Sequence, residues 1–240
     1  MRLLEVENLT ACHGLLTAVR HLSLSVGHGE ALAVIGANGA GKTTLFRSIA
    51  GVHPLASGQV RLSGRDVSAL KASQRVAAGI AMVPEGRRLF GDMSVRENLL
   101  IAGENGRPGK WTMDSVLDAL PALKPLLGVP ADGLSGGQRQ AVAIGRALMS
   151  NPEILLLDEV SLGLSPVAVD GLYASLDLLR ASGTTMVLVE QDLDRALGFA
   201  DRVICMLEGK IMLEGAPHAL ARSDITDAYF GFTEVEQETL

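Results

Sequence analysis

The chain of 240 residues has few aromatic residues and no excess of positive charge, and both shortages exclude classes of function. Phe, Trp and Tyr make up 3% of the residues, too few for a platform that stacks the bases of single-stranded nucleic acid. A formal net charge of -6 opposes broad attraction to a phosphate backbone or an anionic membrane. We therefore expect no nucleic-acid partner. A local phosphate site is still allowed, because it needs only backbone amides and one or two cations.

Cysteine and long apolar runs are also scarce. Cys12 and Cys205 fit no zinc spacing and no CxxC motif, so we expect a reducing compartment and two ordinary thiols. The chain has no run of about 18 apolar residues, which is the length that could span a bilayer. The first ten residues, MRLLEVENLT, lack the apolar segment and cleavage site of a secretory signal. These features predict a cytoplasmic protein that does not itself cross a membrane.

Nearly continuous apolar runs indicate strands that are covered on both faces of a parallel sheet. They are 31–36 (ALAVIG), 79–84 (GIAMVP), 153–159 (EILLLDE) and 184–190 (TTMVLVE), each followed by a turn or a helical pattern. Alternating residues at 22–26 and 59–64 predict antiparallel strands near the N-terminus, and 202–215 predicts a hairpin that turns at Glu208 and Gly209. The predicted fold class is α/β.

The helical patterns predict a single domain with an inserted helical part. Helices are expected at 42–50, before Gly51, and at 167–181, between Ser165-Pro166 and Gly183. Residues 86–150 show several short helical patterns and no convincing strand. We therefore divide the domain 1–240 into a core lobe of 1–85 and 151–240 and a helical subdomain of 86–150. A helical tail and the acidic TEVEQETL end the chain.

The stretch GANGAGKTT fits the pattern GxxxxGK[ST] between a predicted strand and a predicted helix. Its glycines allow the backbone to fold around an anion, so that successive amides and the helix N-terminus face phosphate oxygens. Lys42 is expected at the β and γ phosphates, and the Thr43 hydroxyl is expected to ligate Mg²⁺. The predicted nucleotide-binding residues of this loop are Gly36, Ala37, Asn38, Gly39, Ala40, Gly41, Lys42, Thr43 and Thr44.

Two further segments carry chemistry suited to phosphate transfer. ILLLDE ends a predicted strand in Asp158, which can hold a metal, and Glu159, which can orient or deprotonate a water. By itself it could equally be a strand that ends in acids. LSGGQRQ has the form of a capping box, Ser135 to Gln138, at a second helix N-terminus that attracts anions. Without its neighbours it could be only a helix cap.

Together, GANGAGKTT, LSGGQ and ILLLDE resemble Walker A, the signature motif and Walker B of the nucleotide-binding subunits of ABC transporters, and the resemblance extends over essentially the whole chain. The segments 83–99 (VPEGRRLFGDMSVRENL), 143–159, 161–166 (SLGLSP) and 189–192 (VEQD) resemble the branched-chain (hydrophobic) amino-acid uptake branch. The resemblance implies a P-loop NTPase fold of the ABC type, with ATP and Mg²⁺ as cofactors. It also implies a head-to-tail dimer, in which Leu134, Ser135, Gly136, Gly137 and Gln138 cover the ATP of the partner.

Several positions depart from the pattern of the wider family. Glu85 stands where most members have a glutamine; it can still bind Mg²⁺, or it is a solvated loop acid. His13 falls at the adenine-stacking position, where tyrosine is common, and it either stacks weakly or has no role. Gln191 replaces a histidine that contacts the γ-phosphate, so it is expected to contact phosphate without titrating. Val160 and Ser165 alter the loop that faces the partner.

The resemblance implies an ATP-hydrolysing subunit at the cytoplasmic face of the bacterial inner membrane, powering import of branched-chain or hydrophobic amino acids or a related solute. Expected partners are a second ABC ATPase subunit, two integral-membrane permeases and a periplasmic binding protein. A heterodimer is favoured over a homodimer. Glu159 and Gln191 are the expected catalytic residues. The alternatives are a regulatory subunit that binds ATP with little hydrolysis, suggested by Gln191 and Glu85, and a soluble ABC ATPase outside transport.

Overall fold

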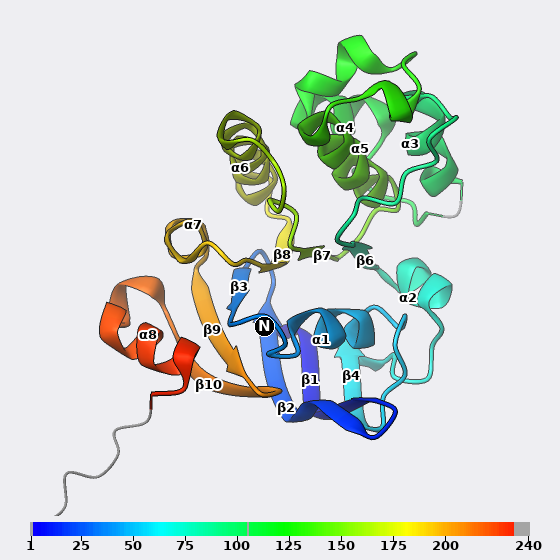
Figure 1. The fold of residues 1–240 in the computed structure, drawn as a ribbon. Coiled ribbons are helices and arrows are strands. Elements are labelled where there is room, and N and C mark those ends of the chain that lie inside the picture. Colours follow the sequence, from blue (N-terminus) through cyan, green and yellow to red (C-terminus); the bar gives the residue numbers. More distant parts are fainter. Residues whose placement is uncertain (1, 105, 233–240) are drawn as a thin grey trace, which may run out of the picture.

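The computed structural model describes residues 2–104 and 106–232, which form two β-sheets with helices around them (Figure 1). A four-stranded antiparallel sheet has the order β2-β1-β4-β5. A six-stranded sheet has the order β10-β9-β3-β8-β7-β6, in which β9 and β10 are antiparallel and the other neighbours are parallel. The strands are β1 (Arg2–His13), β2 (Leu16–Gly27), β3 (Ala31–Ile35), β4 (Ser57–Leu62), β5 (Arg65–Asp66), β6 (Ile80–Val83), β7 (Ile154–Asp158), β8 (Thr185–Val189), β9 (Arg202–Leu207) and β10 (Lys210–Gly215).

Helices connect the strands and cover the sheets. The α-helices are α1 (Lys42–Ile49), α2 (Ala72–Ala78), α3 (Val95–Gly103), α4 (Met113–Ala119), α5 (Gly136–Met149), α6 (Pro166–Ala181), α7 (Leu193–Phe199) and α8 (Arg222–Phe230). Short 3₁₀ helices are η1 (Pro121–Leu126), η2 (Ala131–Gly133) and η3 (Pro217–Ala219). None of the helices formed by residues 2–104 and 106–232 has the length and apolarity that crossing a bilayer needs.

The strands of the parallel sheet are buried on both faces, which explains their continuous apolar runs. In β3, Leu32 and Val34 belong to one apolar cluster, together with the antiparallel sheet and α1. Ala33 and Ile35 point into the other cluster, together with residues of α5 and α6. Because β3, β8, β7 and β6 run parallel as neighbours, their carboxyl ends lie along one edge of the sheet. In such sheets this edge is where ligands bind.

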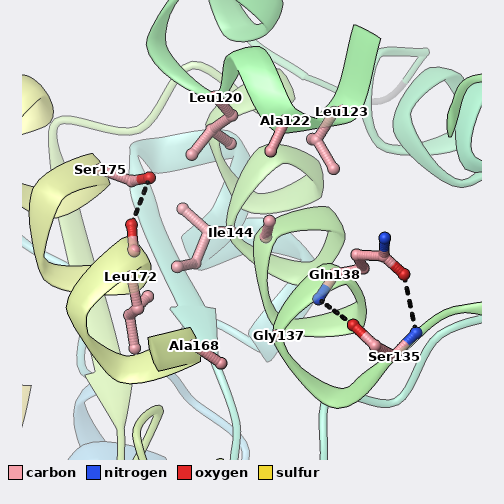
Figure 2. A pocket seen from close by; sticks show the side chains of 12 residues that line it. Leu120, Ala122, Leu123, Ser135, Gly137, Gln138, Ile144, Ala168, Leu172 and Ser175 are labelled. Atoms are coloured by element: carbon pink, nitrogen blue, oxygen red, sulfur yellow. Dashed lines mark hydrogen bonds between the residues drawn. The ribbon is translucent and has the colours of Figure 1, made fainter. Parts of the chain in front are cut away.

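The described residues between 86 and 150 form helices, loops and one isolated bridge, Ser94–Pro130, and they lie together at one end of the molecule (Figure 1). The predicted capping box begins α5: the Ser135 Oγ accepts from the Gln138 N–H (3.3 Å) and the Gln138 Oε1 accepts from the Ser135 N–H (2.8 Å), as Figure 2 shows. The division into two lobes stays a prediction.

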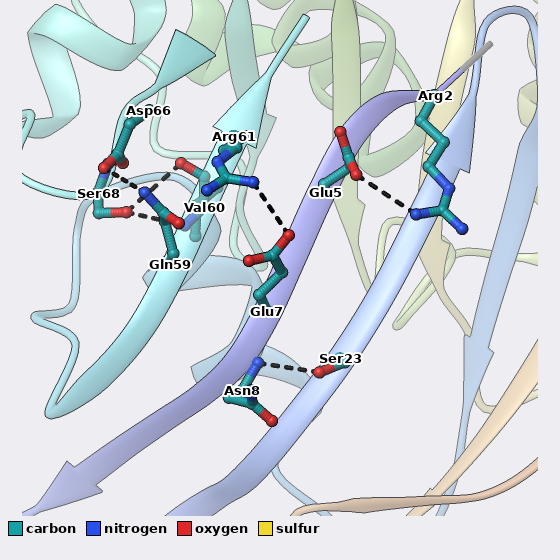
Figure 3. Close-up of polar contacts among 10 residues, drawn as sticks. All are labelled: Arg2, Glu5, Glu7, Asn8, Ser23, Gln59, Val60, Arg61, Asp66 and Ser68. Carbon is teal, nitrogen blue, oxygen red and sulfur yellow. Dashed lines mark hydrogen bonds and ion pairs between the residues drawn. The ribbon is translucent and has the colours of Figure 1, made fainter. Parts of the chain in front are cut away.

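The antiparallel sheet presents a polar face away from its apolar one. Figure 3 shows ion pairs along this face, such as Arg61 Nη1 to Glu7 Oε1 at 3.1 Å and Arg2 Nη1 to Glu5 Oε2 at 3.4 Å. Exposed pairs of this kind add little stability. Leu4 and Val6 of β1 are buried against the core instead. This strand was not predicted, because register shifts along its pairing with β2 break the period of two.

The other predicted elements are confirmed. The antiparallel segments 22–26 and 59–64 lie in or across the ends of β2 and β4, the four apolar runs contain β3, β6, β7 and β8, and the two predicted helices are α1 and α6. The hairpin of β9 and β10 turns at Glu208 (φ 48°) and Gly209 (φ 80°), both left-handed as a type I′ turn requires. The helical tail is α8, and TEVEQETL lies outside the described residues.

Candidate active site

The loop between β3 and α1 is shaped for close backbone approach. Gly36 has φ 147° and Gly41 has φ 100°. A Cβ at Gly36 would lie 2.2 Å from the Met206 carbonyl oxygen, and one at Gly41 would lie 2.2 Å from that of Ala18. Neither position can therefore accept a side chain without moving the backbone of β9 or β2. Gly41 also precedes α1 without a side-chain cap, so the first N–H groups of this helix are left for an anion.

Lys42 is the cation of this loop. Its side chain is 4% exposed, and its Nζ donates to the carbonyl oxygens of Gly36 (2.7 Å) and Ala37 (3.0 Å). Burial lowers the pKa of Lys42, and the nearby carboxylates of Glu159 and Asp158 oppose this effect. The lysine is thus held against the phosphate loop by backbone acceptors and next to the acidic ends of neighbouring strands.

Asp158 ends β7 beside the start of α1. It is fully buried, and its Oδ1 accepts from the Thr43 Oγ1 at 3.1 Å, whereas its Oδ2 has no partner among the described residues. Burial raises the pKa of Asp158 from 3.8 to about 6, and Glu159 and Glu85 contribute in the same direction. The negative charge on this buried carboxylate oxygen is not balanced by a hydrogen-bond donor, and a cation bound beside the Thr43 hydroxyl would balance it.

These residues fit Mg²⁺ bound together with a nucleotide. No cluster of three or more His, Cys, Asp or Glu residues suited to a metal occurs in the described part of the chain. Mg²⁺ does not need one, because it is commonly held by one or two carboxylates, substrate phosphates and water. Asp158 and Thr43 supply a carboxylate and a hydroxyl at the phosphate loop. Glu85 follows β6 on the same edge, exposed at the mouth of the site.

Glu159 and Gln191 meet at the ends of two adjacent strands. β7 and β8 pair in register with Asp158 opposite Val189, so the residues that follow them are neighbours. The Gln191 Nε2 donates to the Glu159 Oε2 at 2.8 Å. Glu159 has φ 49°, a left-handed conformation that is strained for a residue other than glycine. Strain of this kind is found where a structure holds a functional side chain in place.

One cavity of about 490 Å³ brings most of the predicted site residues together. Asn38, Gly39, Gly41, Lys42, Thr43 and Thr44 line it from the phosphate loop, and His13, Glu85, Glu159 and Gln191 line it from other segments. Gly36, Ala37 and Ala40 shape the loop without lining the cavity. The cavity is lined by loop amides, a cation, two hydroxyls and two carboxylates, and Asp158 is hydrogen-bonded to Thr43 beside it. This set is suited to binding phosphate groups and transferring a phosphoryl group to water.

His13 lies on this cavity beside a second imidazole that the sequence did not indicate. The His13 Nε2 lies 3.1 Å from the Thr44 Oγ1, and the rings of His13 and His53 have centroids 4.5 Å apart. The His53 Nε2 is in turn 3.1 Å from the Cys12 carbonyl oxygen. The His53 ring therefore packs against the exposed ring of His13. Stacking of a base on His13 stays a prediction.

The signature residues lie elsewhere. None of Leu134, Ser135, Gly136, Gly137 and Gln138 lines the 490 Å³ cavity. Ser135, Gly137 and Gln138 instead border a separate apolar cavity of about 240 Å³ between α5 and α6 (Figure 2). The chain thus carries two helix N-termini with glycine amides at two different places, as expected if each serves a different nucleotide.

Three other polar residues are buried although the sequence does not mark them. Asn98 is fully buried and its Nδ2 donates to three carbonyl oxygens of the loop before α3. Arg75 is 2% exposed and donates to carbonyl oxygens at the end of α1 and of the segment before α2. Glu190 is 1% exposed at the end of β8. Each lies in a stretch that reads as polar surface, so no local signal marks it as buried.

Comparison with known proteins gives these features a family. The family model described as ABC transporter matches residues 19–161, more than half of the chain. The high-affinity branched-chain amino acid transport ATP-binding protein BraG of Pseudomonas aeruginosa is 39% identical over 95% of this chain and 100% of its own length. The probable branched-chain amino acid transport ATP-binding protein LivF of Archaeoglobus fulgidus is 36% identical over 78% of this chain and 81% of its own.

Solved structures agree with the sequence relatives. A nucleotide-free ATP-binding cassette from an ABC transporter superposes with a TM-score of 0.82 at 29% identity, covering 95% of each chain. A cassette in its ADP conformation has a TM-score of 0.80 at 30% identity, covering 95% of this chain and 94% of its own. The protein therefore belongs to the ABC transporter family, and it is of the ATP-binding and ATP-hydrolysing kind.

Proposed function

We propose that this chain powers a binding-protein-dependent importer of branched-chain or other hydrophobic amino acids, or of a related small solute. The observation that carries the proposal is the 39% identity to BraG over almost all of both chains. LivF, the second relative with an amino-acid transport name, supports the same branch. Lys42 and the candidate base Glu159 line one cavity, and Asp158 is hydrogen-bonded to Thr43 of that cavity, which supports a hydrolysing subunit over a regulatory one.

The phosphate loop would hold the ATP phosphates. Amides of the loop and of the α1 N-terminus would face the phosphate oxygens, and Lys42 would turn from the carbonyl oxygens of Gly36 and Ala37 to the β and γ phosphates. Thr43, Asp158 and Glu85 would hold Mg²⁺, which supplies positive charge to the phosphates as charge shifts to the leaving group. Lys42 donates to carbonyl oxygens, and the Asp158 Oδ2 has no partner among the described residues. Phosphate and Mg²⁺ would supply the opposite charges.

Glu159 would act on the attacking water. Its carboxylate lies on the cavity, and it is held there by the Gln191 Nε2 at 2.8 Å. A carboxylate in this position can orient water and accept its proton. Gln191 can donate a hydrogen bond to the base or to the γ-phosphate but cannot take up a proton near neutral pH. The only proton acceptor of the pair is therefore Glu159.

A second ATPase subunit would complete the site. The signature residues Leu134 to Gln138 lie outside the cavity of their own chain, so they are free to cover a nucleotide held by a partner. A related subunit is the expected partner, with a homodimer as the other arrangement. ATP would then hold the two subunits together, and hydrolysis would release them, which moves the attached membrane subunits.

An apolar groove beside Glu85 offers a surface for a permease. Its volume is about 470 Å³, and it is lined by residues of α2, β6, α3, α5 and the loop after β6, including Pro84, Phe90, Ile101, Ala143 and Arg146. Phe90 is 49% exposed and lies under the Arg146 guanidinium, which is 5.8 Å from its ring centroid. We propose that a helical segment of a permease docks in this groove. Movement of the permease would then be transmitted to Glu85.

Uptake of labelled amino acids by intact cells tests the solute class. In a strain without this gene, we expect uptake of leucine, isoleucine and valine to fall, and expression of the wild-type chain to restore it. Lys42→Ala should fail to restore uptake at equal protein level. Unchanged uptake of all three, with a defect for a sugar or another solute class, would overturn the amino-acid assignment.

A matched pair of variants tests the permease groove. Ile101→Asp places a charge in the groove, whereas Leu178→Asp places one on the outer face of α6, where Leu178 is 52% exposed. We expect Ile101→Asp to abolish co-purification with the permeases and to leave ATP binding intact. Leu178→Asp should retain both. Equal co-purification of the two variants would contradict the docking site.

A further inference from the structure

Glu190 is a buried carboxyl group that the reaction described above does not use. It follows β8 directly, its N–H donates to the Val34 carbonyl oxygen (3.2 Å), and it is 1% exposed. Among residues 2–104 and 106–232, no lysine, arginine or histidine forms an ion pair with it. Burying a carboxyl group without a cation is costly, so its retention here calls for a role in the arrangement around it.

Its hydrogen bonds join the two loops that carry the catalytic pair. The Ser161 Oγ donates to the Glu190 Oε2 at 2.8 Å, and Ser161 lies two residues after Glu159. Next to Glu190, Gln191 donates to Glu159, and the Glu159 N–H donates to the Val189 carbonyl oxygen at 3.3 Å. Three hydrogen bonds thus hold 159–161 against 189–191. Of the two between side chains, the Ser161–Glu190 bond is partly buried and the Gln191–Glu159 bond is exposed.

A third element reaches the same carboxyl group. The Glu190 Oε1 and the Tyr173 hydroxyl are both buried, and neither forms a hydrogen bond with a described residue. Glu190 and Arg195 line one cavity, and the Arg195 guanidinium lies 5.5 Å from the centroid of the Tyr173 ring, so Glu190 and Tyr173 lie in the same region. Burial, the larger cause, and the nearby Glu190 raise the pKa of Tyr173. Tyr173 belongs to α6, and its ring packs edge-on against Phe199 with centroids 5.7 Å apart. The carboxyl group therefore lies between β8, the loop after β7 and the helix that this loop enters.

We propose that Glu190 is a positioning residue for ATP hydrolysis, which fixes Glu159 and Gln191 by holding the Ser161 loop against the end of β8. Glu159 has a strained left-handed backbone, and such a conformation persists only where the surroundings impose it. The Ser161–Glu190 bond is the side-chain contact that imposes it from the protein interior. Loss of this bond lets the loop relax and moves the carboxylate of Glu159 away from the attacking water.

Variants at Glu190 separate this role from a purely structural one. Glu190→Gln keeps an acceptor oxygen for Ser161, so we expect kcat within about threefold of wild type. Glu190→Ala removes it, so kcat should fall about tenfold or more while the Kd for ATP stays within about twofold. Asp192→Ala is the matched control: this exposed carboxylate caps α7 through the Arg195 N–H (3.1 Å) and should leave kcat unchanged.

Ser161 provides a second test that does not disturb the core. Ser161→Ala should reproduce the loss of kcat, Ser161→Thr should restore it, and the double variant Ser161→Ala with Glu190→Ala should lose no more than Glu190→Ala alone. The proposal is overturned if Glu190→Gln and Glu190→Ala reduce kcat equally, if kcat is retained in both, or if kcat, ATP affinity and Tm fall together. The assays use the assembled ATPase dimer, because its hydrolysis is the activity in question.

Discussion

Replacing Asp158 by asparagine should stabilise the protein when nucleotide and metal are absent. Burial, the largest cause, raises the pKa of Asp158 from 3.8 to about 6 in the folded protein. Each unit of pKa difference corresponds to about 1.4 kcal/mol, so ionised Asp158 lowers the free energy of unfolding by roughly 3 kcal/mol at pH 8. An asparagine carries no charge, and its side-chain oxygen can still accept from Thr43.

The gain should depend on pH in one direction. Because the folded-state pKa is the higher one, bound proton stabilises the folded protein below about pH 4, and this contribution is lost as pH rises through about 6. The advantage of Asp158→Asn is therefore roughly 3 kcal/mol at pH 8, roughly 1.6 kcal/mol at pH 5, and near zero at lower pH.

Urea denaturation in EDTA between pH 5 and pH 8 measures this difference. Asp177→Asn, at an exposed position of α6, is the control and should change stability by less than about 0.5 kcal/mol. The same Asp158→Asn protein should lose Mg²⁺-dependent ATP turnover. A gain that is absent, or that does not shrink from pH 8 to pH 5, would show that this carboxylate is not kept at a cost in stability for the metal.

Three further variants test the site. Lys42→Ala should lose ATP binding in a direct titration, because the phosphates lose their buried cation, and retained affinity would contradict its role. Gln191→Ala removes the N–H that holds Glu159 at 2.8 Å, so kcat should fall about tenfold with little change in ATP affinity; an unchanged kcat would make Gln191 a bystander. Ser135→Ala removes the α5 cap and should lower the free energy of unfolding by about 1 kcal/mol, measured in urea, while hydrolysis by a mixed dimer falls at the partner's nucleotide; a loss of stability alone would limit Ser135 to capping.

The main sheet and the phosphate loop could be predicted because their signals are local. Continuous apolar runs marked strands buried on both faces, and the order of glycines, Lys42 and Thr43 marked the loop between β3 and α1. Glu159 and Gln191 were each expected at the site, and the structure shows that the pairing of β8 with β7 brings them into contact.

The remaining features depend on contacts between distant segments. Glu190 stands in the polar sequence VEQD, and its burial results from backbone pairing with Val34, far away in the chain. The His53 ring packs against His13 because the segment after α1 returns to the end of β1, and no residue pattern predicts this contact. The left-handed conformation of Glu159 is likewise a property of the turn after β7, adopted by a residue type that rarely shows it.

The turnover of Glu159→Gln in the assembled ATPase tests most directly whether Glu159 is the base. Glutamine keeps the size of the side chain and cannot accept the proton of the attacking water. We predict that this variant binds ATP with an affinity like that of the wild type, holds the dimer closed and shows no measurable hydrolysis. Hydrolysis at the rate of the wild type would show that Glu159 is not the base and would contradict the mechanism built on this site.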